Sequence, residues 1–129
     1  MADLANAGTI AGGKSSTQIL QEMLDIPGAN AVVVVGRDGF VIESAGALGA
    51  IDMDTVGASV AMVLNGAESM GKELNLAPFH TVTLEAPNAM IMCTPAGEAL
   101  LVILAADSKT LGMIRLQIKK RIPELAQLF

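Results

Sequence analysis

The segment Gly8–Ser15 (GTIAGGKS) has the residue types and spacing of a phosphate-binding loop. It matches the pattern G-x-x-x-x-G-K-[ST] at every position, and a helical pattern follows it. In such a loop, backbone N–H groups bind the phosphates of a nucleotide, and the lysine reaches the β- and γ-phosphates. Asp107, which follows a predicted strand, would be the candidate magnesium ligand. The loop also requires a hydrophobic strand before it, and Met1–Ala7 (MADLANA) is too small and polar to be one. We therefore rank nucleotide binding through Gly8–Ser15 behind two other hypotheses.

Acid–base or nucleophilic chemistry would depend on His80 and Cys93, the single histidine and single cysteine of the chain. Neither is accompanied by a recognisable orienting group or a nucleophile turn. A metal site needs three or four ligands, and the neighbouring carboxylates Asp52 and Asp54 are explained as helix caps. We therefore predict no catalytic residue, no metal site, no cofactor and no enzymatic activity.

Two basic features could contact a partner. Arg37 lies in an Arg-Asp-Gly turn and could enter the active site of another protein as an arginine finger. The run Lys119–Arg121 could contact acidic lipid or protein. We interpret Arg37 as a solvated turn residue and the basic run as the solvated face of an amphipathic helix.

Composition restricts the class of protein. The chain has 129 residues, of which 52% are hydrophobic and 16% charged, with a net charge of −5. This predicts one folded domain, residues 15–129, after a flexible tail, residues 1–14. Without a long basic patch or any Trp or Tyr, nucleic-acid binding is not expected. One cysteine, no secretory signal pattern and no apolar run of membrane-spanning length predict a cytoplasmic protein without an integral membrane segment.

Hydrophobic periodicity predicts three helices and five strands. The expected helices have apolar stripes over Ile19–Ile26, Val56–Leu74 and Leu111–Leu125. Their expected caps are, in the same order, Ser15–Thr17, Asp52 or Asp54, and Asp107 or Ser108. Pro123 is expected to break or kink the last helix. The expected strands are Ala31–Gly36, Phe40–Ser44, Phe79–Glu85, Ala89–Thr94 and Ala99–Ala105. Because the loops within each group of strands are of hairpin length, the strands must be antiparallel. The sequence therefore predicts an α/β (α+β) fold in which two hairpin units share one sheet.

Self-association is expected from the middle helix and the third strand. Small residues such as Gly57, Ala61 and Gly66 would allow another backbone to approach the helix closely. Thr81 and Thr83 leave the third strand without a central Lys or Pro to block edge pairing. Pairing of this strand across a two-fold axis would remove the edge and bury apolar surface.

The order of these elements resembles the Roadblock (dynein light chain type) family, and especially its bacterial and archaeal MglB-like branch. The resemblance covers about residues 17–128 and rests mainly on Asp25–Gly28, on Ala31–Ile42 with its GRDGFVI turn, on the Ala/Gly-rich helix 53–74 and on Leu101–Ala105 followed by Leu111–Arg115. It implies a five-stranded antiparallel sheet in the order α-β-β-α-β-β-β-α, with one helix on one face and two on the other.

The resemblance also implies a homodimer paired through the middle helix and third strand, and binding to a small Ras-like GTPase. The expected interface residues are Val56, Val60, Val63, Ala67, Met70, Phe79, Thr81 and Thr83. Two hypotheses remain ahead of nucleotide binding. The first is a dimeric regulator that modulates GTP hydrolysis by the GTPase. The second is a dimeric adaptor or scaffold that leaves nucleotide turnover unchanged.

Overall fold

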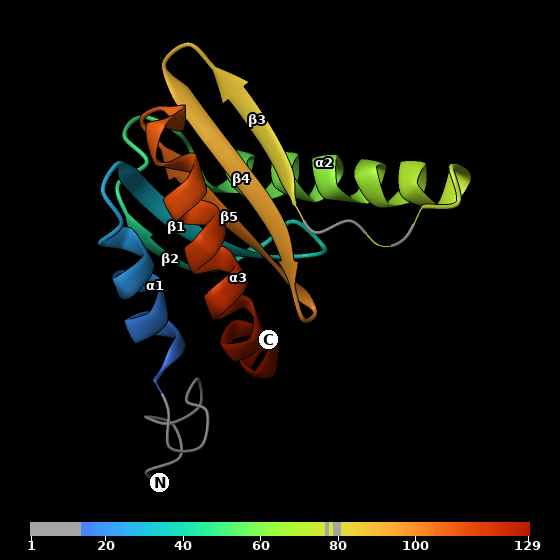
Figure 1. The fold of residues 1–129 in the computed structure, drawn as a ribbon. Helices are drawn as coiled ribbons and strands as arrows, with labels where there is room; N and C mark the ends of the chain where they lie inside the picture. Colours follow the sequence, from blue (N-terminus) through green and yellow to red (C-terminus); the bar gives the residue numbers. More distant parts are fainter. Residues whose placement is uncertain (1–13, 77, 79–80) are drawn as a thin grey trace, which may run out of the picture.

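The computed structural model describes residues 14–76, 78 and 81–129. In this part of the chain, five antiparallel strands form one sheet that is flanked by three α-helices (Figure 1). In chain order the elements are α1 (Ser16–Leu24), β1 (Ala29–Gly36), β2 (Val41–Gly46), α2 (Met53–Glu73), β3 (Val82–Ala86), β4 (Ala89–Ala96), β5 (Ala99–Ala105), the short 3₁₀ helix η1 (Ser108–Thr110) and α3 (Leu111–Leu128). The strand order is β2-β1-β5-β4-β3. The predicted fold class and element order are confirmed.

The hairpin β1–β2 is closed by the turn that carries the GRDGFVI sequence. The Gly36 N–H donates to the Phe40 carbonyl at 2.7 Å, and the Phe40 N–H donates to the Asp38 carboxylate at 3.1 Å. Gly39 adopts φ +93°, a conformation that side chains disfavour. The second strand therefore begins at Val41, one residue later than predicted, and Phe40 is left exposed in the turn.

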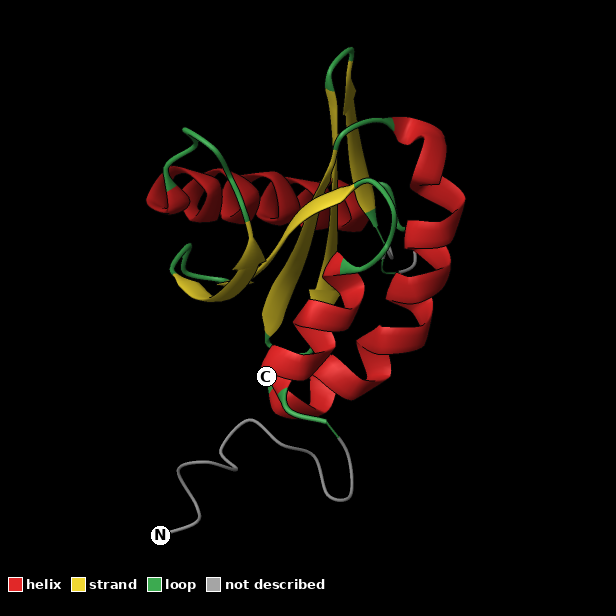
Figure 2. Ribbon diagram, turned by 90° about the vertical axis from the view of Figure 1, so that its left-hand side faces the viewer, coloured by secondary structure: helices red, strands yellow, loops and turns green. Residues whose placement is uncertain are grey.

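Two hydrophobic clusters lie on opposite faces of the sheet (Figure 2). Helices α1 and α3 cover one face, where Leu20 and Ile114 are buried together with strand residues such as Leu101. Helix α2 covers the other face through Val60 and Leu64. Central strand β5 is buried on both faces because its neighbours β1 and β4 protect its edges and helices protect its faces.

Side-chain caps start the first two helices where the sequence predicted them. Ser15 accepts a hydrogen bond from the Gln18 N–H at 3.2 Å, and the Gln18 side chain accepts from the Ser15 N–H in return, a capping box. Asp52 accepts from the Thr55 N–H at 3.1 Å. These bonds satisfy backbone donors that a helix start leaves unpaired.

The last helix differs from the prediction at its start and near its end. It begins after η1, with Thr110 at the cap position and without a side-chain cap, while Asp107 accepts from the Lys109 N–H at 2.8 Å. Pro123 does not break the helix, which continues to Leu128. The missing proline N–H removes one backbone hydrogen bond, but the fully buried Leu125 anchors the following turn in the core.

The third strand is shorter than predicted and starts later. It begins at Val82 instead of Phe79, and it ends at Ala86. Phe79 and His80 lie outside the described residues.

None of the helices in the described part of the chain is long and apolar enough to cross a membrane.

Candidate functional site

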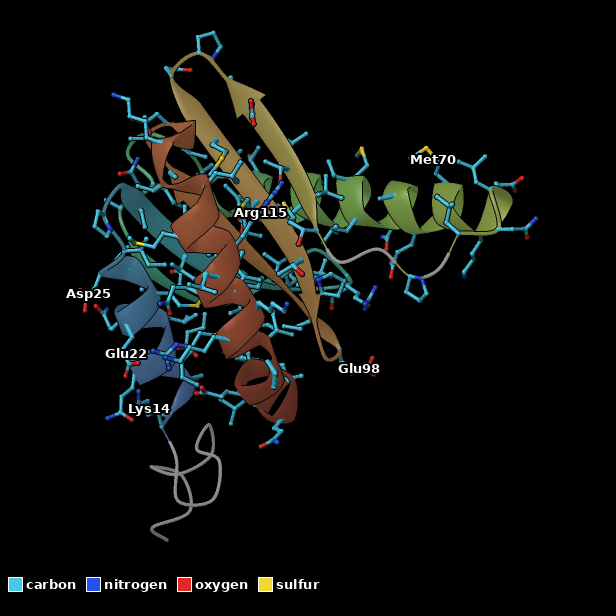
Figure 3. All side chains as sticks on the ribbon, in the orientation of Figure 1. Lys14, Glu22, Asp25, Met70, Glu98 and Arg115 are labelled. Carbon is cyan, nitrogen blue, oxygen red and sulfur yellow. The ribbon has the colours of Figure 1, made fainter. Side chains whose placement is uncertain are left out.

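The last two residues of the phosphate-loop pattern, Lys14 and Ser15, stabilise the start of α1. The Lys14 ammonium forms an ion pair with Glu22 at 2.7 Å, and both residues are labelled in Figure 3. Ser15 is the helix cap described above. The Arg121 guanidinium reaches the same Glu22 carboxylate at 2.5 Å, so this carboxylate ties α1 to α3. The hydrogen bond from Lys14 is the main cause that lowers the pKa of Glu22 below its usual value, and Arg121 lowers it further. Gly8–Gly13 lie outside the described residues.

Cys93 is buried in the strand β4, where α2 covers the sheet. Burial raises the pKa of its thiol to about 11, because a thiolate would lose its hydration there. The thiol therefore remains protonated near neutral pH and is a poor nucleophile. Within the described ranges, no group of three or more His, Cys, Asp or Glu side chains could hold a metal ion.

Arg37 holds the β1–β2 turn against α2. Its guanidinium donates to the Glu68 carboxylate at 2.8 Å, and about one third of each side chain remains exposed. Arg37 is therefore a partly solvated turn residue, as interpreted from the sequence, but it also has an ion-pair partner that the interpretation did not include. The sequence offered no local signal for this contact, because the partner lies 31 residues away on another element.

Helix α2 presents an apolar outward face. Met62 is 74% exposed and Met70 is 59% exposed, and small or neutral residues surround them, namely Ala58, Ser59, Asn65, Gly66 and Ser69. From Thr55 to Gly71 the helix contains one charged residue, Glu68, which Arg37 neutralises. A solvated helix face normally carries several Lys and Glu residues, so this face has the composition of a contact surface.

The second half of α2 extends beyond the sheet. Figure 1 shows the helix crossing behind the strands and projecting past β3. Met70 points away from the ribbon on this projecting part (Figure 3), and Leu74 and Leu76 just after it are also exposed. The apolar outward face of α2 therefore continues onto a part of the helix that its own sheet does not cover.

The structure divides the predicted stripe on α2 between the core and the surface. Val60 is buried against the sheet of its own chain, and Val56 packs beside it. Val63 and Ala67 are half-buried, and Met70 is exposed. The five steps from Val56 to Leu74 cover 18 residues, an average of 3.6 per step, so the stripe stays on one side of the helix. Its later residues are exposed because the second half of α2 projects beyond the sheet.

Strand β3 forms one free edge of the sheet within the described structure, with β2 at the other. Its partner on the inner side is β4, in the register Val82↔Cys93 and Thr83↔Met92. Thr81 and Thr83 are half-buried, and Leu84 is 45% exposed. The outer side of β3 and the outward face of α2 together form the candidate interaction surface of the chain.

Comparisons with known proteins agree with this description. The family model "Roadblock/LC7 domain" matches residues 16–105. An uncharacterized protein of Methanocaldococcus jannaschii is 30% identical over 112 residues, which cover 87% of this chain and 94% of that protein.

Three solved structures with similar folds are MglB proteins. MglB of Myxococcus xanthus has a TM-score of 0.80 and 25% identity, covering 90% of this chain and 98% of that one. The gliding protein MglB of Thermus thermophilus has a TM-score of 0.76 and 28% identity, covering 87% of this chain and 86% of that one. A third structure, described as MglB with a tetrameric arrangement, has a TM-score of 0.79 and 28% identity, covering 87% of this chain and 85% of that one.

Proposed function

This chain belongs to the Roadblock/LC7 family, in its MglB-like branch, and from this premise we propose that it is a homodimeric regulator that binds a small Ras-like GTPase and modulates its GTP hydrolysis. The similarity to MglB proteins supports a regulatory protein that acts through its contacts with other proteins. The proposal places it in the cytoplasm and assigns it no catalytic group of its own.

The observation that carries the proposal is the apolar outward face of α2. Exposed Met62 and Met70 on a helix face almost free of charge would lose contact with water if a second copy covered them. The same contact would bring the β3 edges of two copies together and extend the sheet across the dimer. In this arrangement Val63, Ala67, Met70, Thr81 and Thr83 belong to or border the interface, whereas Val56 and Val60 support it from within the core.

Two α2 helices side by side would offer a broad surface to the switch region of a GTPase. Switch loops are ordered around the γ-phosphate and are released after hydrolysis. A protein that contacts them therefore binds the GTP and GDP states with different affinities. It can change the hydrolysis rate by stabilising one arrangement of the loops, without contributing a catalytic side chain.

The test uses a Ras-like GTPase from the same genome. Its affinity for the full-length chain is measured by calorimetry in the GDP state and with a non-hydrolysable GTP analogue, and its single-turnover GTP hydrolysis is followed with and without the chain. We expect at least about tenfold tighter binding to the GTP state and an altered hydrolysis rate. The control is the variant Met113→Glu on α3, which changes an exposed methionine on the opposite face of the sheet and is expected to behave as the wild type in both measurements.

Each outcome separates the competing functions. Equal affinity for both states with unchanged hydrolysis would favour the adaptor or scaffold hypothesis. Absence of GTPase binding together with nucleotide binding by the chain alone, abolished by Lys14→Ala, would favour the phosphate-loop hypothesis.

A further inference from the structure

A groove lies between α3 and the outer strands β4 and β3, on the sheet face opposite α2. It has a volume of about 730 Å³. Thr81 and Thr83 form part of its floor, and the α3 residues Arg115, Ile118 and Lys119 form part of its wall. Thr83 is paired with Met92, whose side chain is buried beneath the α1 and α3 layer, so the two threonines lie on the α3 side of β3.

The wall of this groove carries two cations that the fold does not use. Neither Arg115 nor Lys119 forms an ion pair within the described residues, and both are exposed. Lys72, Lys109 and Lys120 likewise form no ion pair within the described residues, so Arg115 and Lys119 are distinguished by their place in the groove lining. The chain as a whole has a net charge of −5, so two neighbouring cations in one groove are a local reversal of its charge.

The remaining lining is suited to a peptide more than to a small ion. Ile118 and Ile122 offer apolar contact along α3, and the threonine hydroxyls of β3 can donate and accept hydrogen bonds. The volume lies in the range of sites that hold sizeable ligands and is far larger than a phosphate ion needs. The nearest acidic residue of β3 on this face, Glu85, is two residues beyond Thr83 and is not part of the lining.

We propose that this groove binds an extended acidic segment of a partner protein. Arg115 and Lys119 are four residues apart on a helix, which corresponds to a rise of about 6 Å. Alternate residues of an extended chain are about 6.6 Å apart and point to the same side. A segment with Asp or Glu at alternate positions therefore places successive carboxylates beside Arg115 and Lys119, while its other face contacts the threonines.

This site lies on the sheet face opposite α2, and it shares only the β3 threonines Thr81 and Thr83 with the surface assigned to self-association. Helix α2 lies on the other face of the sheet, so a segment in the α3 groove would leave α2 accessible (Figure 2). The chain would then connect a GTPase to a third protein. The groove proposal does not depend on the GTPase proposal, and either can fail without the other.

The test is a binding titration with the full-length chain. The probe is a fluorescein-labelled peptide of nine residues with glutamate at alternate positions, and its match is the same peptide with glutamine at those positions; anisotropy is the readout. We expect the wild type to bind the glutamate peptide at least about tenfold tighter than the glutamine peptide, since charge-assisted hydrogen bonds are lost in the latter. The double variant Arg115→Gln, Lys119→Gln is expected to lose this difference.

A control variant and a competitor decide the interpretation. Lys120→Gln removes an exposed cation of the same helix that does not line the groove, and it is expected to keep the affinity within about twofold of wild type. An equal loss in Lys120→Gln and in the double variant would overturn the proposal, as would equal binding of the two peptides. Complete displacement of the peptide by millimolar inorganic phosphate would also overturn it, in favour of a small-anion site.

Discussion

The thiol of Cys93 is held in its protonated form by its position in the sheet. Its side chain lies between β3 and β5 and below α2, and only 1% of the residue is exposed. Burial raises the pKa from 9.0 to about 11 because the charged form loses hydration. A residue that the sequence offered as a candidate nucleophile is therefore a small apolar core residue.

The first prediction concerns the reactivity of this thiol. A pKa higher by about two units lowers the thiolate fraction about a hundredfold at pH 8. Labelling by an aromatic disulfide reagent should therefore be at least about a hundredfold slower in the native chain than in urea. Equal rates in the two conditions, followed by absorbance, would contradict the buried position of Cys93.

The second prediction concerns the pH dependence of stability. Because the folded pKa of Cys93 lies above the unfolded value of 9.0, the folded state binds more protons between these two values. The free energy of unfolding should be fully retained below pH 9 and fall by about 2 kcal/mol as the pH rises toward 11. Urea titrations of Cys93→Ala should show a flatter decline over the same pH range, and an identical decline in both proteins would contradict the assignment.

At the scale of the elements, α2 is held against the β1–β2 turn by a close backbone approach. A Cβ atom added at Gly57 would overlap the carbonyl oxygen of Gly39, and Gly39 itself sits at φ +93° against Ala58. The Arg37–Glu68 ion pair spans the same turn and helix. Together these contacts fix where α2 starts on the sheet and hence where its outward face points.

The third prediction tests this close approach. Gly57→Ala should lower the free energy of unfolding by about 1–3 kcal/mol, because the new methyl group forces the helix away from the turn. The matched control is Gly71→Ala on the same helix, where an added Cβ meets no atom within 4 Å. This control should gain about 0.5 kcal/mol from its higher helix propensity. Urea unfolding measures both changes, and equal effects in the two variants would show that the approach is not tight.

The fourth prediction concerns the free edge of β3. If two copies pair through this edge, the outward amides of Val82–Ala86 become hydrogen-bonded only in the dimer. Hydrogen exchange of this segment should slow by about tenfold or more between low and high micromolar concentration. The amides of β2, at the other edge of the sheet, provide the internal control. Exchange of β3 that does not slow while the dimer fraction rises over the same concentration range would place the interface elsewhere.

At the scale of the whole molecule, the exposed apolar residues are unevenly distributed. Of the ten large hydrophobic side chains that are exposed in the described structure, five belong to α2, the segment after it and β3; they are Met62, Met70, Leu74, Leu76 and Leu84. This concentration on one side is what favours a second copy of the chain over random surface exposure.

The fifth prediction is the oligomeric state. Light scattering should give the wild type a molar mass of twice 13.2 kDa. Met62→Glu places a charge at the centre of the outward face of α2 and should weaken the dimer by at least about tenfold, since an unpaired charge must then be desolvated. Met113→Glu, a methionine exposed on α3, should leave the dimer intact.

The controls make this result decisive. Circular dichroism should be unchanged in both variants because both methionines are exposed. A wild-type monomer at tens of micromolar would contradict self-association, and a monomeric Met113→Glu with a dimeric Met62→Glu would move the interface to α3.

The sequence alone was sufficient to predict the elements and their antiparallel connection. Helix caps at Ser15 and Asp52, the turn at Gly39 and the apolar run Ala99–Ala105 are local signals, and each is confirmed. Hairpin-length loops leave no room for a crossover, so sheet topology within each hairpin also followed from local chemistry. The doubly buried central position of β5 was visible because a strand covered on both faces lacks alternation.

Only the tertiary structure determined which side chains are buried, which are paired and which are left exposed. The pairing of Arg37 with Glu68, the burial of Val60, the continuation of α3 past Pro123 and the groove beside Arg115 all depend on contacts between segments distant in sequence. Periodicity shows that a helix has an apolar stripe, but not which part of the stripe its own sheet will cover. That part is set by where the helix crosses the sheet and where it projects beyond it, and this is a property of packing between elements, not of any one segment.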